Sequence, residues 1–167
     1  MEKEIKKVMR DSIKKGDLLT VKQILAGNKE WLNESTPFGS WLQVASAHGQ
    51  YDIVKYLIAC GIDINYVGGM SEDTALTQAA FRGNVDIIEL LYDNGAVFDV
   101  SNANRNPLFA AIYNGHFNVV KYLVENGIDI TASYPIGQLE NVDAYEYARQ
   151  YGQTEIANYL KTKLNEM

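Results

Sequence analysis

The chain contains two histidines, His48 and His116, and one cysteine, Cys60. Catalytic bases, nucleophiles and zinc ligands in proteins are often histidines or cysteines. A nucleophile needs an adjacent base and a metal needs several converging ligands, but these three residues stand far apart in the sequence. A zinc site is therefore not expected, and a single cysteine excludes an intrachain disulfide.

Two further patterns could carry chemistry, and neither has the required spacing. The glycine pair within Val67–Met70 lacks the patterns G-x-x-x-x-G-K-[ST] and G-x-G-x-x-G of phosphate-binding loops. The adjacent acids Glu72 and Asp73 stand in a turn-rich stretch, where exposure to solvent accounts for them. The sequence therefore predicts a protein that is not an enzyme, with no catalytic residues, no metal and no cofactor.

The composition narrows the classes of partner. The 167 residues carry 21 acidic and 15 basic side chains, which gives a net charge of −6 and a pI near 4.9. Nucleic-acid binding needs a basic surface, so DNA and RNA are not expected partners. No apolar run approaches the roughly 18 residues of a membrane-spanning helix. We expect a chain compatible with the cytoplasm that binds neither nucleic acid nor membrane.

The first fifteen residues differ in charge from the rest. They hold six Lys and Arg against three acids, so the remaining residues carry a net charge of −9. The segment lacks the apolar stretch of a secretory signal. Its apolar residues are spaced as in one amphipathic helix: Ile5, Val8, Met9 and Ile13. A solvated outer face explains the basic charge, and an electrostatic contact with an acidic partner is the alternative.

A glycine-based pattern recurs through the chain. Gly49, Gly83 and Gly115 are each followed four and five residues later by a β-branched pair, then by a leucine, and after twelve residues by a second glycine. Gly16 and Gly152 continue the same register with weaker matches. Self-similarity at a period of 32 to 37 residues is typical of a repeat protein.

Each repeat has the local features of two short helices. Nine residues before the opening glycine stands a residue type that caps a helix N-terminus: Ser40, Thr74, Asn106 and Asp143. The β-branched pair and the leucine then form one buried stripe on a second helix. Between repeats, turn-rich stretches are expected to form hairpin-like fingers, the longest of them at residues 131–142.

The period, together with the segments TALTQAA from Thr74 and NPLFAAI from Asn106, resembles the ankyrin repeat. The resemblance implies an all-α solenoid of helix-turn-helix units with hairpin-like fingers, in a single domain over residues 1–167. Its approximate units are 1–33, 34–67, 68–100, 101–134 and 135–167, with the first and last as caps. The signature histidine of the family is replaced by Gln43, Thr77, Phe109 and Glu146. His116 stands where ankyrin repeats commonly carry histidine and is expected to tie neighbouring turns together.

The resemblance also implies a function, because ankyrin repeats usually bind proteins through the concave face formed by fingers and first helices. Phe81 and Tyr113 occupy equivalent positions and should lie side by side on this face. Tyr56 and Tyr122 fall on second helices and are expected to pack rather than bind. The positions carried over as partner-binding are Phe38, Trp41, His48, Met70, Asp73, Phe81, Arg82, Arg105, Tyr113, Asn114 and Tyr151.

The sequence therefore predicts a non-catalytic protein-binding module that is a monomer when free and has one partner protein of unknown identity. Such a protein could be a bacterial immunity protein or inhibitor. The alternatives are a sensor that binds a peptide or small molecule in the concave groove, a secreted effector acting on a host protein, and a structural adaptor.

Overall fold

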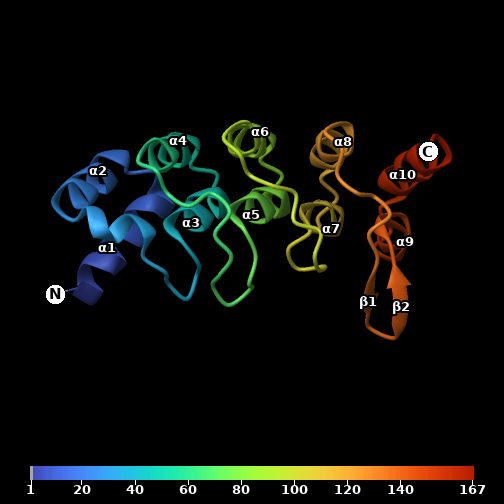
Figure 1. Ribbon diagram of the computed structural model, residues 1–167, viewed down its shortest axis with the longest axis horizontal. Helices are drawn as coiled ribbons and strands as arrows, with labels where there is room; N and C mark the ends of the chain where they lie inside the picture. Colours follow the sequence, from blue (N-terminus) through green and yellow to red (C-terminus); the bar gives the residue numbers. More distant parts are fainter. Residues whose placement is uncertain (1) are drawn as a thin grey trace.

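The computed structural model describes residues 2–167 and shows an all-α solenoid in which helices lie in two rows (Figure 1). The inner row contains the first helix of each unit: α1 (Glu2–Lys15), α3 (Trp41–Ala47), α5 (Ala75–Arg82), α7 (Pro107–Tyr113) and α9 (Ala144–Gln150). The outer row contains the second: α2 (Leu18–Gly27), α4 (Tyr51–Ala59), α6 (Val85–Asp93), α8 (Phe117–Glu125) and α10 (Thr154–Asn165). The predicted fold class and repeat architecture are confirmed.

The predicted N-caps begin the inner helices of units two to five. Ser40, Thr74 and Asp143 each accept a hydrogen bond from the backbone N–H three residues later, and Asn106 accepts one from Leu108. These bonds satisfy amide groups that have no partner within the helix. The caps fix where each inner helix begins and therefore which of its side chains face the fingers.

The opening glycines allow adjacent turns to approach closely. Gly83 has a φ of +78°, and a Cβ atom there would lie 2.7 Å from Nδ1 of His116. The Nε2 atom of His116 lies 3.0 Å from the carbonyl oxygen of Phe81. His116 thus ties the turn of one unit to the next, as predicted. Gln50, Asn84 and Gln153 occupy the same place over the opening glycines of their neighbours.

The core runs between the two rows of helices along the whole chain. The predicted β-branched pairs and leucines of α4, α6 and α8 are buried. In α1, Met9 and Ile13 are buried and Ile5 is half-buried, as an amphipathic helix requires, but Val8 is exposed. The first helix therefore joins the solenoid through a narrower apolar stripe than the sequence pattern predicts.

The fingers differ more than expected. The fourth is a β-hairpin in which β1 (Tyr134–Ile136) pairs antiparallel with β2 (Leu139–Val142). The first two contain only isolated bridges, Thr36 with Gly39 and Gly68 with Asp73. The third, at residues 96–106, has no strand pairing. A short 3₁₀ helix, η1 (Lys29–Asn33), precedes the first finger.

Candidate protein-binding groove

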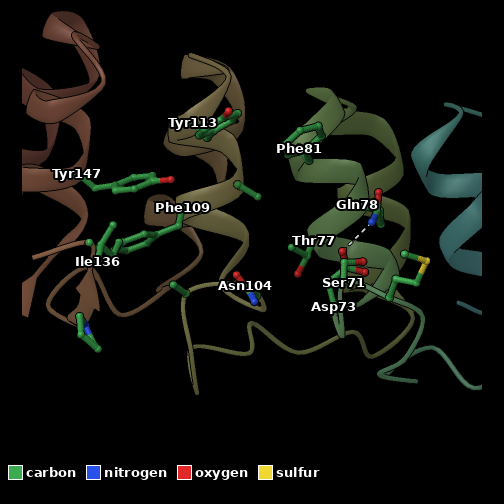
Figure 2. A pocket seen from close by; sticks show the side chains of 15 residues that line it. Ser71, Asp73, Thr77, Gln78, Phe81, Asn104, Phe109, Tyr113, Ile136 and Tyr147 are labelled. Atoms are coloured by element: carbon green, nitrogen blue, oxygen red, sulfur yellow. Dashed lines mark hydrogen bonds between the residues drawn. The ribbon is translucent and has the colours of Figure 1, made fainter. Parts of the chain in front are cut away.

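A groove of about 710 Å³ lies between the inner helices and the fingers of units three to five. Its walls come from α5, α7, α9 and the turn of the β-hairpin (Figure 2). The labelled lining residues are Ser71, Asp73, Thr77, Gln78, Phe81, Asn104, Phe109, Tyr113, Ile136 and Tyr147. The groove therefore combines residues from three units on one face.

Three exposed aromatic rings follow one another at this groove, and two of them, Phe81 and Tyr113, line it. The ring centroids of Phe81 and Tyr113 are 6.0 Å apart, and those of Tyr113 and Tyr151 are 5.0 Å apart. The three side chains are exposed by 39%, 47% and 44% respectively. The predicted proximity of Phe81 and Tyr113 is confirmed. We call Phe81, Tyr113 and Tyr151 the inner aromatic row.

A second aromatic group supports this row from below. Phe109 is buried, with its ring 5.0 Å from that of Tyr134 and 4.6 Å from that of Tyr147. The ring of Tyr147 is also 4.6 Å from that of Tyr151. Burial, followed by the hydrogen bond to Tyr151, raises the pKa of the Tyr147 hydroxyl.

Tyr134 and Tyr147 were not among the predicted binding residues, although the type of residue at position 109 indicated aromatic neighbours. Phe109 replaces the small polar imidazole of the family signature with a larger apolar ring. Such a ring needs apolar neighbours from the next finger and the next helix, and tyrosines occupy both positions.

The first two fingers extend the surface toward the N-terminus. Met70 and Phe38 stand out at their tips, with exposed fractions of 86% and 55%. His48 is also exposed, and its Nδ1 atom lies 2.9 Å from the carbonyl oxygen of Val44. The three residues line a smaller hollow of about 220 Å³. This hollow shares Met70, Ser71 and Gln78 with the large groove, so the two are continuous.

Two of the predicted binding residues do not offer their side chains to a partner. Trp41 is 0% exposed, and its indole N–H donates to the carbonyl oxygen of Trp31 at 2.8 Å. Asp73 is 6% exposed and accepts hydrogen bonds from the side-chain amides of Gln43 at 3.1 Å and Gln78 at 2.6 Å. The placement of Trp41 on the binding surface is therefore wrong, because its side chain is buried within the stack. Asp73 does line the groove, but the expected exposure of its carboxylate is wrong, since both oxygens accept hydrogen bonds from glutamine amides.

The remaining polar positions divide between the surface and the scaffold. The guanidinium of Arg82 is exposed and lies 5.8 Å from the ring centroid of Phe81. Arg105 donates to the carbonyl oxygen of Glu72 at 3.2 Å and pairs with Asp99 at 3.9 Å, so it joins two fingers. The amide of Asn114 donates to the carbonyl oxygen of Phe81 at 2.8 Å. Arg82 is thus the most available of these groups to a partner.

No cluster of three or more His, Cys, Asp or Glu side chains able to hold a metal occurs within residues 2–167. In the same residues, no helix is both long and apolar enough to cross a membrane. Cys60 is a free thiol exposed at the end of α4. The groove is lined by aromatic rings, hydroxyls and amides, and Arg82 stands beside it over the ring of Phe81.

Comparison with known proteins agrees with the stacked units. Residues 42–134, more than half of the chain, match the model of ankyrin repeats in three copies. The chain belongs to the ankyrin-repeat family. Ankyrin repeats form protein–protein interaction modules, and the family is generally non-catalytic, so a protein is the expected kind of partner.

Several relatives match this chain over a small part of their own, longer chains. The palmitoyltransferase AKR1 of Lachancea kluyveri is 31% identical over 131 residues, which cover 74% of this chain and 18% of the relative. The alpha-latrocrustotoxin-Lt1a of Latrodectus tredecimguttatus is 37% identical over 109 residues, 63% of this chain and 7% of the relative.

The target of rapamycin complex 2 subunit AVO2 of Saccharomyces cerevisiae is 29% identical over 136 residues, 78% of this chain and 32% of the relative. This chain therefore corresponds to about a third or less of the length of these proteins.

Proposed function

We propose that this ankyrin-repeat protein binds a partner protein through its concave surface, with the inner aromatic row as the main anchor. The observation that carries the proposal is the exposure of three neighbouring rings, of which Phe81 and Tyr113 line the groove and Tyr151 lies against Tyr113. Grouped apolar side chains on a surface mark interaction sites more often than single ones do.

The physical properties of the row suit an interface. Aromatic side chains bury a large area for few rotatable bonds, and Tyr and Arg are enriched among the residues that dominate binding energy. The rings of Phe81 and Tyr113 are already stacked on one another, and Asn114 holds the backbone of Phe81. A partner would therefore meet a surface that needs little ordering, which reduces the entropic cost of binding.

The finer form of this proposal is inhibition by occlusion, as an immunity protein acts on a toxin. A chain that offers a binding surface changes its partner's activity by covering part of the partner. A cytoplasmic location accords with this role. Co-expression with the product of a neighbouring gene tests it, because an inhibitor should restore growth when that product is toxic.

The binding face itself is tested by affinity capture followed by mass spectrometry, with quantitative titration of the captured partner. Phe81→Ala combined with Tyr113→Ala should weaken binding roughly thirtyfold or more, since removing a central aromatic anchor typically costs about 2 kcal/mol. Lys55→Ala with Glu89→Ala, both exposed on outer helices, is the matched control. Loss of the partner in the control pair, with retention in the aromatic pair, would place the interface on the outer face.

A further inference from the structure

The groove continues from the aromatic region to a basic end at α1. A hollow of about 280 Å³ is lined by Lys3, Lys7 and Arg10 together with Pro37 and Phe38 of the first finger. Lys6 also lies there and pairs with Glu34 at 2.6 Å. Four basic side chains from α1 are therefore gathered at one end of the concave surface.

Phe38 connects this basic end to the rest of the groove. The guanidinium carbon of Arg10 is 5.3 Å from its ring centroid, and Nζ of Lys14 is 5.7 Å from it. Arg10 also makes a long contact of 3.4 Å with Asp11. Pro37 and Phe38 line both the basic hollow and the next one, which in turn shares Met70 with the large groove. The three hollows thus form one path from α1 to the β-hairpin.

The two ends of this path differ in chemistry. At the far end stand the rings of Tyr113 and Tyr147 and the aliphatic side chain of Ile136, and no Lys or Arg is among the described residues that line it. At the near end, the cations of α1 lie on a chain that is otherwise net negative, since residues 16–167 carry eighteen acids against nine bases. To bind a nucleic acid, a protein needs positive charge along the whole surface that the phosphate backbone follows. A ligand that is acidic at one end and apolar at the other fits better.

We propose that the groove binds an extended polypeptide segment whose acidic residues lie against α1 and whose aromatic or aliphatic residues occupy the groove of units three to five. The inference rests on the proposed function and specifies the partner's chemistry. Phe38 and Met70, exposed between the two ends, provide the apolar contact that joins them. The basic charge of α1 then selects the partner, and the aromatic row supplies most of the affinity.

The test begins with selection of random twelve-residue peptides displayed on phage against the immobilised full chain. Enriched sequences should carry Asp or Glu in one half and aromatic or aliphatic residues in the other. The selected peptides are synthesised with a fluorescent label, and their affinities are measured by anisotropy at low and high salt. Versions with Lys in place of the acids, and a single-stranded oligothymidine, serve as comparison ligands.

Matched variants separate the two ends of the groove. Lys7→Gln with Lys14→Gln should weaken the acidic peptide about fivefold or more and reduce its dependence on salt. Lys15→Gln with Lys55→Gln removes the same charge from residues that line none of the three hollows, and should leave affinity unchanged. Phe81→Ala with Tyr113→Ala should lower the affinity for the peptide more than either pair of lysine substitutions does.

Three other outcomes would overturn the inference. Peptides that depend on Phe81 and Tyr113 but lack an acidic half would overturn this inference and leave the proposed function standing. Peptides that bind independently of Phe81 and Tyr113 would overturn the proposed function as well. Tighter binding of oligothymidine than of any peptide, lost in the variant of Lys7 and Lys14, would assign the basic end to nucleic acid.

Discussion

The inner and outer faces of this solenoid both carry aromatic side chains, in different surroundings. On the outer helices, Tyr92 stacks on Phe98 at 4.7 Å and meets Tyr122 edge-on at 6.5 Å. Tyr159 meets Phe117 edge-on at 5.4 Å. These outer rings are half-buried against the core, as predicted for Tyr122, whereas the rings of the inner aromatic row are exposed.

The difference shows that ring position within a repeat determines its role. An outer ring lies over the gap between neighbouring second helices, so it replaces water with protein contacts and stabilises the stack. An inner ring lies at the end of a first helix beside the groove, where its contacts with neighbouring rings leave much of its surface uncovered. We therefore expect outer substitutions to change stability and inner substitutions to change binding.

Removal of residues 143–167 should have the largest effect on stability, because it deletes the last inner helix and the last outer helix. It takes away α9 and α10 and leaves buried side chains of unit four uncovered, among them Leu108, Val120 and Leu123. Repeat arrays without a polar end unit lose solubility. Size-exclusion chromatography and thermal melting should show aggregation and a broad transition. A truncated chain that remains monomeric and melts as sharply as the full chain would contradict the assignment of unit five as a cap.

Tyr92→Ala should lower stability by about 2–3 kcal/mol, because it removes a half-buried ring with two aromatic partners. At about 2–4 °C per kcal/mol, the melting temperature should fall by roughly 4–12 °C. Phe81→Ala on the inner row is the matched comparison and should change stability by less than about 1 kcal/mol. Urea titration measures both changes. Equal losses of stability in the two variants would contradict the distinction between inner and outer aromatic rings.

Gln43→Ala should lower stability and loosen the second finger, since Gln43 is buried beneath that finger. Its side-chain amide donates to the carbonyl oxygens of Gly68 and Asp73 and to the Asp73 carboxylate. Leaving such buried acceptors unpaired costs about 1–3 kcal/mol. The finger that carries Met70 should also loosen, which limited proteolysis within residues 68–73 would detect. A variant with a native cleavage pattern would show that the finger does not depend on this amide.

The smallest effect should appear at alkaline pH. Burial is the main cause that raises the pKa of Tyr122 and of Tyr159. The unfolded chain loses these protons near pH 10 while the folded chain retains them, so stability should fall as pH rises above about 10. Tyr122→Phe with Tyr159→Phe should reduce that slope. The Tyr159 hydroxyl is buried without a hydrogen-bond partner, so Tyr159→Phe should change stability little at pH 7. An unchanged slope in the double variant would contradict this account.

Much of the fold could be predicted because its determinants are local. Opening glycines with positive φ, residues such as Ser40 and Thr74 that cap helices, and β-branched pairs act within a few residues of themselves. The positions of Phe81 and Tyr113 followed from their equivalent place in two consecutive units. Repetition thus converts local patterns into a spatial arrangement.

The failures concern side chains whose direction depends on an irregular neighbour. Trp41 turns toward the carbonyl oxygen of Trp31 in η1, a short helix that the repeat pattern does not contain. Asp73 turns inward because Gln43 and Gln78 both donate to its carboxylate. Neither direction is encoded in the spacing of the repeat.

The stacking of units has a consequence for how the chain responds to its partner. The principal contacts between elements join parts of the same unit or of adjacent units, so the stability of the solenoid is a sum of nearest-neighbour terms. Unit one and unit five share no such contact, and each end can fray independently of the other. A ligand lying along the whole groove would touch non-adjacent units at once. It would add long-range coupling to these nearest-neighbour contacts, so that binding would make the five units unfold more cooperatively.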